Sequence, residues 1–168
     1  MARSRAAVVA ILAAALAGGS VAGRWLGEQR RAAHDTDVAV VTRVLDGDTI
    51  AIRTRAGTTD TVRLLGVDTP ETQHPDRGVE CFGPEAAAHT VQRLSGASVR
   101  LEGDVEARDR YDRRLAYVYL DGARFNDELL RLGYARLLVL DPNRLHARAL
   151  LRAELEARSA GRGLWSEC

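Results

Sequence analysis

Apolar and polar residues alternate in three short runs between residues 38 and 67. The first run, over residues 38–45, is rich in β-branched residues and ends at an Asp-Gly turn signal. A second alternating run covers residues 48–54, and after a polar turn a third run covers residues 61–67. Because short connections join neighbouring antiparallel strands, these runs predict a curled three-stranded meander.

Helix and strand signals alternate through the rest of the chain. Pro84 and Glu85 open an alanine-rich stretch, which predicts a helix ending near Leu94, since proline and acidic residues favour the first helical turn. Apolar runs predict two further strands. These strands cover residues 97–102 and 115–120, and they are followed by a short helix over residues 126–132, an extended segment over 134–140 and a final helix over 145–159.

Five strands with a helix between the third and the fourth follow the order of an OB-type Greek-key barrel. We therefore predict an α+β domain, a five-stranded OB-type Greek-key β-barrel with about three helices. At 168 residues the chain has the length for one such domain. In the final helix we expect Asn143 to act as the N-cap. We expect one face of this helix to carry Leu145, Ala149, the aliphatic stem of Arg152, and Leu155.

The N-terminal residues have the pattern of an export signal. Arg3 and Arg5 precede an uncharged stretch, residues 6–23, that is rich in Ala, Val, Leu and Gly. This order is typical of a secretory signal peptide or of an uncleaved membrane anchor, and Ala15-Leu16-Ala17 fits a cleavage site. We expect a signal peptide or anchor over residues 1–23, a polar linker over 24–37, and an exported domain over 38–168, secreted or on the outer face of the cell membrane.

The balance of charge limits the class of function. The chain has 24 basic and 23 acidic residues, for a formal net charge of +1. A nearly neutral protein does not coat nucleic acid by charge alone, although it can still have a local site lined by arginine.

The two cysteines, Cys81 and Cys168, are even in number. In an exported protein they are expected to form a disulfide, and two free thiols are the alternative.

Two carboxylates are expected at neighbouring strand ends. Asp48 follows the glycine of the first turn, and Asp68 follows the third predicted strand. Carboxylates together with a backbone carbonyl, here that of Thr69, are the ligands that Ca²⁺ takes. Each motif by itself is also a common turn sequence.

Charged residues near these aspartates complete a candidate site. Arg63 belongs to the third predicted strand and is expected to face the same end of the barrel. Pro70 holds the backbone away from helical geometry, so Glu71 can point toward the metal site. Arg113 lies in a charged turn before a strand, where a solvated surface residue is the alternative.

Two long motifs together resemble the thermonuclease (staphylococcal nuclease-like) family. The first consists of Asp-Gly-Asp-Thr-Ile-x-Ile over residues 46–52 and Arg-Leu-x-x-Val-Asp-x-Pro-Glu over residues 63–71. The second is Asp-Arg-Tyr-x-Arg-x-Leu-Ala-x-Val-Tyr over residues 109–119. Further similarity extends the resemblance over roughly residues 38–167.

The resemblance implies a Ca²⁺-dependent nuclease on an OB barrel that cleaves DNA and RNA with little sequence preference and leaves 3′-phosphate ends. It implies no obligate protein partner, and we expect a monomer, with anchoring through residues 6–23 as the alternative to secretion. The implied roles are metal ligation by Asp48, Asp68 and the Thr69 carbonyl, activation of water by Glu71, phosphate binding by Arg63 and Arg113, and weaker substrate contacts by Arg110 and Tyr111.

Two positions depart from the family's pattern. Asp112 stands where Gly or Gln is usual, and its carboxylate can pair with Arg113. Residues 137–140 are apolar where the family often has tyrosines, which leaves Tyr111 and Tyr134 as candidates for base stacking. The alternative function is a noncatalytic OB module that binds nucleic acid or protein at the cell envelope, and such a module does not need the full set of charged residues.

Overall fold

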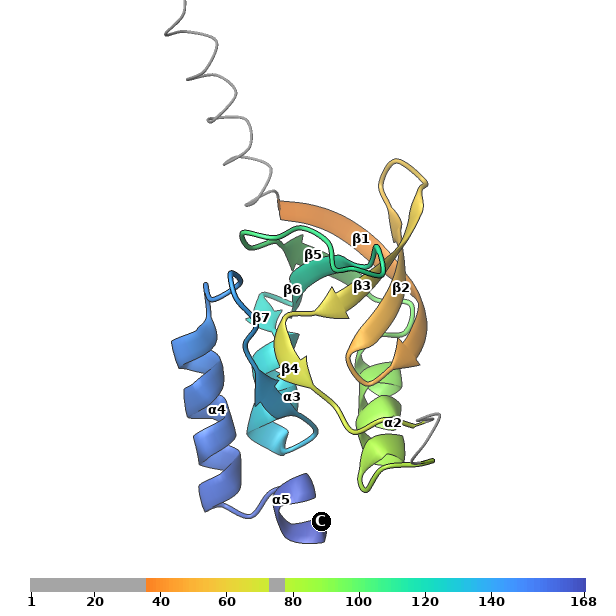
Figure 1. Cartoon of the computed structure of the whole chain (residues 1–168). Helices are drawn as coiled ribbons and strands as arrows, with labels where there is room; N and C mark the ends of the chain where they lie inside the picture. The colour runs from red at the N-terminus through yellow and green to blue at the C-terminus, as the bar shows by residue number, and fades with distance from the viewer. Residues whose placement is uncertain (1–35, 73–77) are drawn as a thin grey trace, which may run out of the picture. The chain divides into compact units, whose positions relative to one another are not determined.

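Five strands close into a barrel in the computed structural model, which describes residues 36–72 and 78–168 (Figure 1). They are β1 (Thr36–Asp46), β2 (Thr49–Thr54), β3 (Thr59–Leu64), β5 (Ser98–Glu102) and β6 (Arg114–Leu120). The strand order is β3-β2-β1-β5-β6, and a parallel pairing between β3 and β6 closes the sheet. The predicted OB-type barrel is therefore confirmed, whereas the expected leader over residues 1–23 lies outside the described residues.

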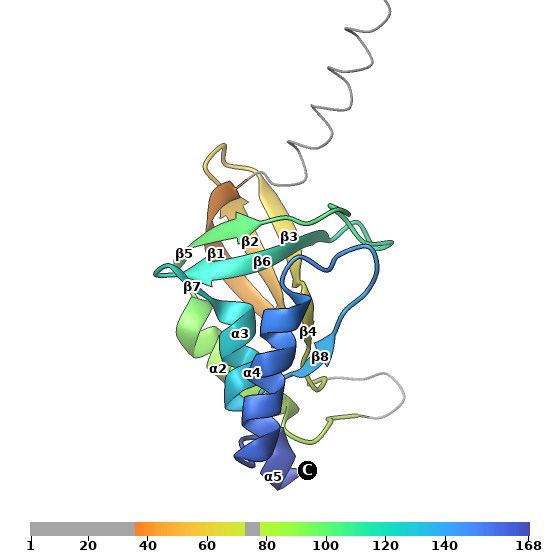
Figure 2. The same cartoon turned by 90° about the vertical axis from the view of Figure 1, so that its left-hand side faces the viewer.

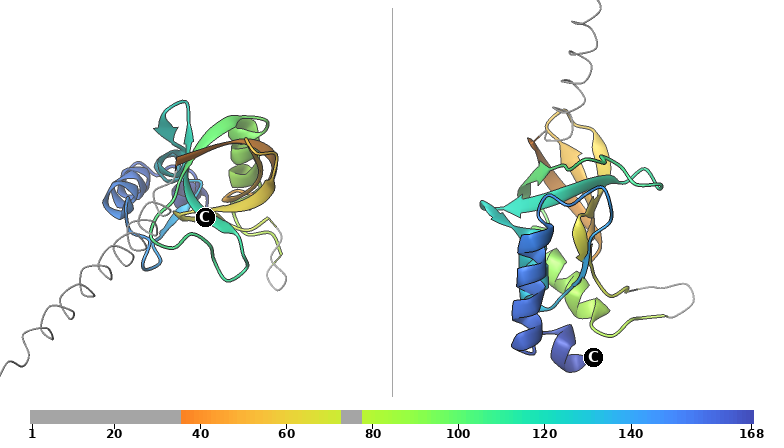
Figure 3. Two further views of the ribbon diagram at one scale, coloured as in Figure 1. Left: turned by 90° about the horizontal axis from the view of Figure 1, so that it is seen from above. Right: turned by 60° about the vertical axis from the view of Figure 1, so that its left-hand side comes forward.

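Alternation along the strands builds the core of the barrel. On β2, Ile50 and Ile52 are fully buried while Arg53 is exposed. Val62 of β3 and Leu101 of β5 are fully buried as well, so the inward faces of successive strands form one apolar interior. The left view of Figure 3 shows these strands curving around that interior.

The third predicted strand is two strands in the structure. β3 ends at Leu64, and β4 (Gly66–Asp68) leaves the barrel to pair with β8 (Arg136–Leu138). Gly66 has a φ of +75°, and a Cβ on it would lie 2.3 Å from the Leu150 side chain. The break depends on glycine, and the apolar run that predicted one strand does not reveal it.

The helices gather at one end of the barrel (Figures 1 and 2). They are α2 (Gly83–Leu94), α3 (Phe125–Leu132), α4 (Ala147–Ser159) and the short α5 (Leu164–Glu167), and a short strand, β7 (Ala123–Arg124), precedes α3. None of the helices in the described residues has the length and apolarity needed to cross a membrane.

The predicted orientation of the final helix was wrong. Leu145 and Leu155 are 45% and 52% exposed, and the buried side chains of α4 are those of Leu150, Ala153, Glu154 and Ala157. The predicted cap was also wrong, because the helix begins after His146 and the Asn143 side chain instead accepts a 2.8 Å hydrogen bond from the Glu106 backbone. Asn143 therefore fixes the loop that precedes β6.

Candidate active site

The Arg63 guanidinium lies between the two predicted metal-ligand carboxylates. Its Nη1 is 3.1 Å from Asp48 Oδ2, and its Nη2 is 3.0 Å from Asp68 Oδ1. Nη1 also donates a 2.8 Å hydrogen bond to the Val67 carbonyl, across the break between β3 and β4. The break thus brings Asp68 back over Arg63, and the expected meeting of Asp48, Arg63 and Asp68 is present in the structure.

Asp48 is held by the turn between β1 and β2. Its Oδ2 accepts a 3.0 Å hydrogen bond from the Thr69 amide, and its Oδ1 accepts one of 3.0 Å from the Thr49 hydroxyl. A Cβ on Gly47 would lie 2.7 Å from Thr69 Oγ1, so the turn packs directly on Thr69. The carboxylate of Asp48 is therefore buried beside Thr69 in a fixed orientation.

Glu71 lies within a cluster of acidic residues. Burial, a hydrogen bond to Asp46 and the negative charges of Asp46, Asp48 and Asp68 raise the pKa of Glu71 to about 7. Burial also raises the pKa of Asp68, and it outweighs the opposite effect of Arg63. Asp46 was missed as a site residue by the sequence reasoning, although it is the first residue of the Asp-Gly-Asp turn.

The residue types at this cluster fit a hard divalent cation. The Asp48 and Asp68 carboxylates and the Thr69 carbonyl are oxygen donors of the kind that Ca²⁺ takes. Thr69 Oγ1 is buried without a hydrogen-bond partner in the described part of the chain, and a cation would relieve the crowded negative charge that raises the pKa of Glu71. Among the described residues, no group of three or more His, Cys, Asp or Glu side chains has metal-binding geometry.

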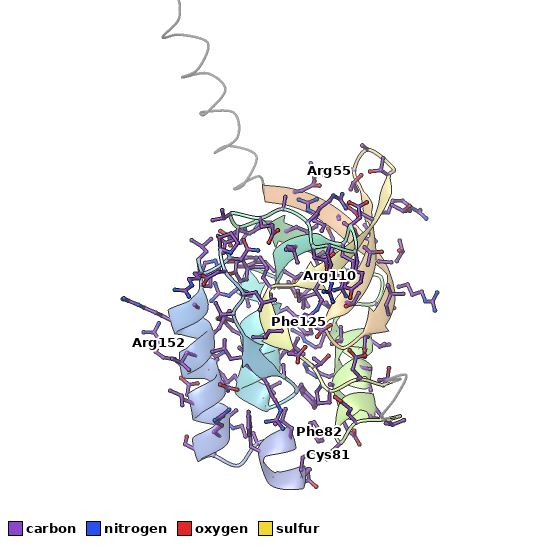
Figure 4. All side chains as sticks on the ribbon, viewed as in Figure 1. Arg55, Cys81, Phe82, Arg110, Phe125 and Arg152 are labelled. Carbon is purple, nitrogen blue, oxygen red and sulfur yellow. A yellow bond between two sulfur atoms is a disulfide. The ribbon has the colours of Figure 1, made fainter. Side chains whose placement is uncertain are left out.

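The second arginine cluster meets Arg63 in a cavity of about 500 Å³. The parallel pairing of β3 with β6 sets Arg63 opposite Leu115, two residues after Arg113. Arg63, Arg113, Arg110 and Tyr111 all line this cavity, as do Leu138 and Leu140. Barrel closure thus places both predicted phosphate-binding arginines in the lining of one cavity. Arg110 is labelled in Figure 4.

Arg113 is oriented by Asp109 rather than by Asp112. Its Nε donates a 2.7 Å hydrogen bond to Asp109 Oδ2. Burial raises the pKa of Asp109, but the hydrogen bonds from Arg113 and Tyr111 outweigh it and lower the pKa overall. Asp112 has a φ of +63°, and its carboxylate lies 3.6 Å from Arg108. Asp112 therefore adopts the left-handed backbone conformation of the turn. The carboxylate that pairs with Arg113 is that of Asp109, and not that of Asp112 as expected.

Only one of the two candidate tyrosines lies in the cavity. Tyr111 is 63% exposed, and the Arg110 and Arg113 guanidinium groups lie 4.7 and 5.4 Å from its ring centroid. Tyr134 instead stacks on His89, with the ring centroids 4.3 Å apart. Tyr134 therefore lies away from the cavity that Tyr111 lines, and its availability for base stacking stays a prediction.

Cys81 and Cys168 form a disulfide, with a Cα–Cα distance of 6.0 Å. A second cavity, of about 510 Å³, extends from this disulfide to the acidic cluster. Its lining residues are Asp68, Thr69, Pro70, Glu71, Glu80, Cys81, Arg136 and Cys168.

Comparison with known proteins agrees with the geometry. Residues 61–167 match the family model described as "Staphylococcal nuclease homologue". The protein named Thermonuclease of Staphylococcus hyicus is 40% identical over 126 residues, which are 75% of this chain and 74% of that protein. The Thermonuclease of Staphylococcus intermedius is 41% identical over the same shares, and Endonuclease YncB of Bacillus subtilis is 39% identical over 74% of this chain and 60% of its own length. The chain belongs to the staphylococcal nuclease family.

Proposed function

We propose that this protein is an exported, Ca²⁺-dependent nuclease that cleaves DNA and RNA with little sequence preference and leaves 3′-phosphate ends. That it is a nuclease, and so a phosphodiester hydrolase, follows from its family and from its relatives, which are named thermonucleases and endonucleases. Ca²⁺ dependence, export, breadth of substrate and the roles of individual residues are our proposals.

One observation carries the proposal: a single arginine contacts two carboxylates on one side and lines a cavity with a second arginine on the other. A phosphodiester in that cavity would have Arg63 and Arg113 on its oxygens. Both guanidinium groups strengthen their contacts as negative charge builds on phosphorus. Arg63 also contacts the acidic cluster, through Asp48 and Asp68.

The roles of the remaining residues follow from this placement. Asp48, Asp68 and the Thr69 carbonyl would hold the cation, which when bound supplies positive charge against the scissile phosphate. The Glu71 carboxylate takes a proton from the attacking water. Water adds to phosphorus, the bond to the 5′ oxygen breaks, and this oxygen takes up a proton from solvent, which leaves a 3′-phosphate and a 5′-hydroxyl. Arg110 and Tyr111 contact the neighbouring nucleotide more weakly.

A digestion experiment tests the proposal. Plasmid, single-stranded DNA and RNA are incubated with the protein over a titration of Ca²⁺ and with EGTA, and the product ends are mapped. We expect cleavage of all three substrates that rises with Ca²⁺ and stops in EGTA. Undiminished cleavage of single-stranded DNA in EGTA would contradict the Ca²⁺ assignment.

Export is proposed from the N-terminal pattern. Arg3 and Arg5 followed by the uncharged residues 6–23 support a signal peptide, with an anchor on the outer face of the membrane as the alternative. N-terminal sequencing of the protein recovered from the culture medium and from the membrane fraction separates the two. A chain that stays in the cytoplasm contradicts both.

A further inference from the structure

Residues 80–83, which we call the brace, lie directly against Glu71. The Glu80 amide donates a 2.9 Å hydrogen bond to the Glu71 carbonyl, and the Glu71 amide donates one of 3.1 Å to Glu80 Oε2. Both main-chain polar groups of Glu71 are therefore bonded to a single residue. The main chain on which the Glu71 side chain is mounted is fixed through Glu80.

Gly83 closes the other side of this contact. A Cβ on Gly83 would lie 2.6 Å from the Glu71 carbonyl oxygen and 3.0 Å from that of Pro70. Real side chains do not approach backbone atoms so closely, so a larger residue here must displace residues 70–71 or the start of α2. The brace and the Glu71 backbone are in contact at two separate points.

A covalent link ties the brace to the C-terminal helix. Cys81, in the middle of the brace, is bonded to Cys168, which directly follows α5. That helix is itself fixed, because the Leu164 amide donates a 2.9 Å hydrogen bond to the Gly133 carbonyl at the end of α3. The Trp165 ring is also covered by the Arg158 guanidinium, which lies 4.1 Å from the ring centroid. Figure 4 labels Cys81 and Phe82 beside α5.

We propose that the brace, locked by the Cys81–Cys168 disulfide, is a positioning device for Glu71, and that Glu80 and Gly83 are positioning residues for hydrolysis. This inference rests on the catalytic role of Glu71 proposed above. A base must lie within hydrogen-bond reach of the water it activates, and a misplacement of about 1 Å can lower a rate by about 100-fold. The disulfide, which links residues 87 positions apart, anchors the brace to the C-terminal end of the domain.

A four-variant cycle tests the inference: the wild type, Glu71→Gln, the double variant Cys81→Ser with Cys168→Ser, and all three substitutions together. Single-turnover cleavage of single-stranded DNA is measured at a temperature where circular dichroism shows every variant to be folded, and KM is measured separately. We expect the double variant to lower the cleavage rate at least about tenfold with little change in KM. We expect it to cause no further loss once Glu71 is Gln.

Two variants within the brace give an independent test. Gly83→Ala should lower the rate in the same way, because its Cβ meets the Glu71 carbonyl. Glu80→Ala should lower the rate, and Glu80→Gln should restore most of it, since an amide oxygen also accepts the Glu71 N–H. Ile52→Val, a core change far from the brace in sequence, is the control for a simple loss of stability.

The possible outcomes are distinct. A double variant with the wild-type rate overturns the inference and leaves the proposed function intact. Equal losses with Glu71 and with Gln at position 71 also overturn it, because the disulfide would then act only through general stability. If Glu71→Gln is as active as the wild type, the proposed role of Glu71 fails, and the inference fails with it.

Discussion

Arg63 is the residue on which both sides of the site depend. Its guanidinium contacts Asp48 and Asp68 and also faces the cavity that Arg113 lines. Its side chain is only 15% exposed, so its orientation is set by neighbours and not by solvent. A lysine at this position would retain the charge but could not fork between two oxygen groups.

Replacement of Arg63 should therefore damage catalysis more than folding. We expect Arg63→Ala to lower kcat by about 100- to 1,000-fold, because a donor to the developing negative charge is lost. We expect Arg63→Lys to recover only part of this loss. The matched control is Arg55→Ala, at the exposed tip of the β2–β3 hairpin, labelled in Figure 4. Cleavage rates of plasmid DNA and RNA provide the measurement, and equal effects at the two positions would contradict the assignment.

The sequence identified most of the candidate site residues, but it did not predict all the side chains with which they pair. Asp48, Arg63 and Asp68 meet as the spacing of their motifs predicted. The pairing of Arg113 with Asp109, four residues earlier, was not foreseen, because several arginines and aspartates in that turn are equally close in sequence. The stacking of Tyr134 on His89 was not predicted, because an apolar segment after a helix does not show which way a ring will pack.

Among the secondary-structure elements, the break between β3 and β4 does most to position the site. A continuous strand would carry Asp68 along the barrel and away from Arg63. Gly66 permits the break, through both its positive φ and the proximity of Leu150. The apolar pattern predicted the positions of the five barrel strands, but this turn depends on tertiary contacts that no short pattern contains.

Gly66→Ala should destabilise the domain by roughly 3 kcal/mol, since it adds left-handed backbone strain to a steric clash with Leu150. Gly57→Ala is a matched control, because Gly57 has a φ of +85° and, apart from Gly57 and its two chain neighbours, no described residue lies within 4 Å of the place a Cβ would take. We expect the control to lose only the backbone contribution, about 1 kcal/mol. Urea unfolding measures the free energy of unfolding of both variants. Equal losses would show that the Leu150 side chain moves aside without loss of stability.

The contact between α2 and α3 should make stability depend on pH. Glu128 accepts hydrogen bonds from Arg93 Nε at 2.8 Å and pairs with His89 Nε2 at 3.0 Å. Burial raises the pKa of Glu128, but the bonds from Arg93 and His89 outweigh it and lower the pKa overall. Because the folded-state pKa is lowered, the stabilisation is present above the unfolded-state pKa, near about 4.3, and is lost as the pH falls through the folded-state value.

The expected difference in unfolding free energy between wild type and Glu128→Gln is roughly 1 kcal/mol at pH 7. This difference should shrink toward zero as the pH falls below about 4, because the Glu128 carboxylate of the wild type then becomes protonated and neutral, as Gln is at every pH. Urea unfolding at a series of pH values measures it. A difference that stays constant across this range would mean that the ionised carboxylate is not the stabilising group.

On the scale of the whole molecule, the disulfide joins two segments 87 residues apart. In the chain-entropy account, a cross-link over so long a loop stabilises the folded state by about 4–5 kcal/mol. We expect reduction to lower the unfolding free energy by up to that amount, as measured by urea unfolding with and without a thiol reductant. A free-thiol assay on the purified protein should detect no reactive cysteine before denaturation and reduction.

The parallel pairing of β3 with β6 also has a consequence for how activity relates to folding. Arg63 and Arg113 come from distant parts of the chain, and the pairing that closes the barrel brings them to one cavity. A chain that has formed the meander but has not yet been joined by β6 has one arginine and no opposing one. The proposed hydrolysis would therefore require a closed barrel, because an open one lacks the cavity that both arginines line.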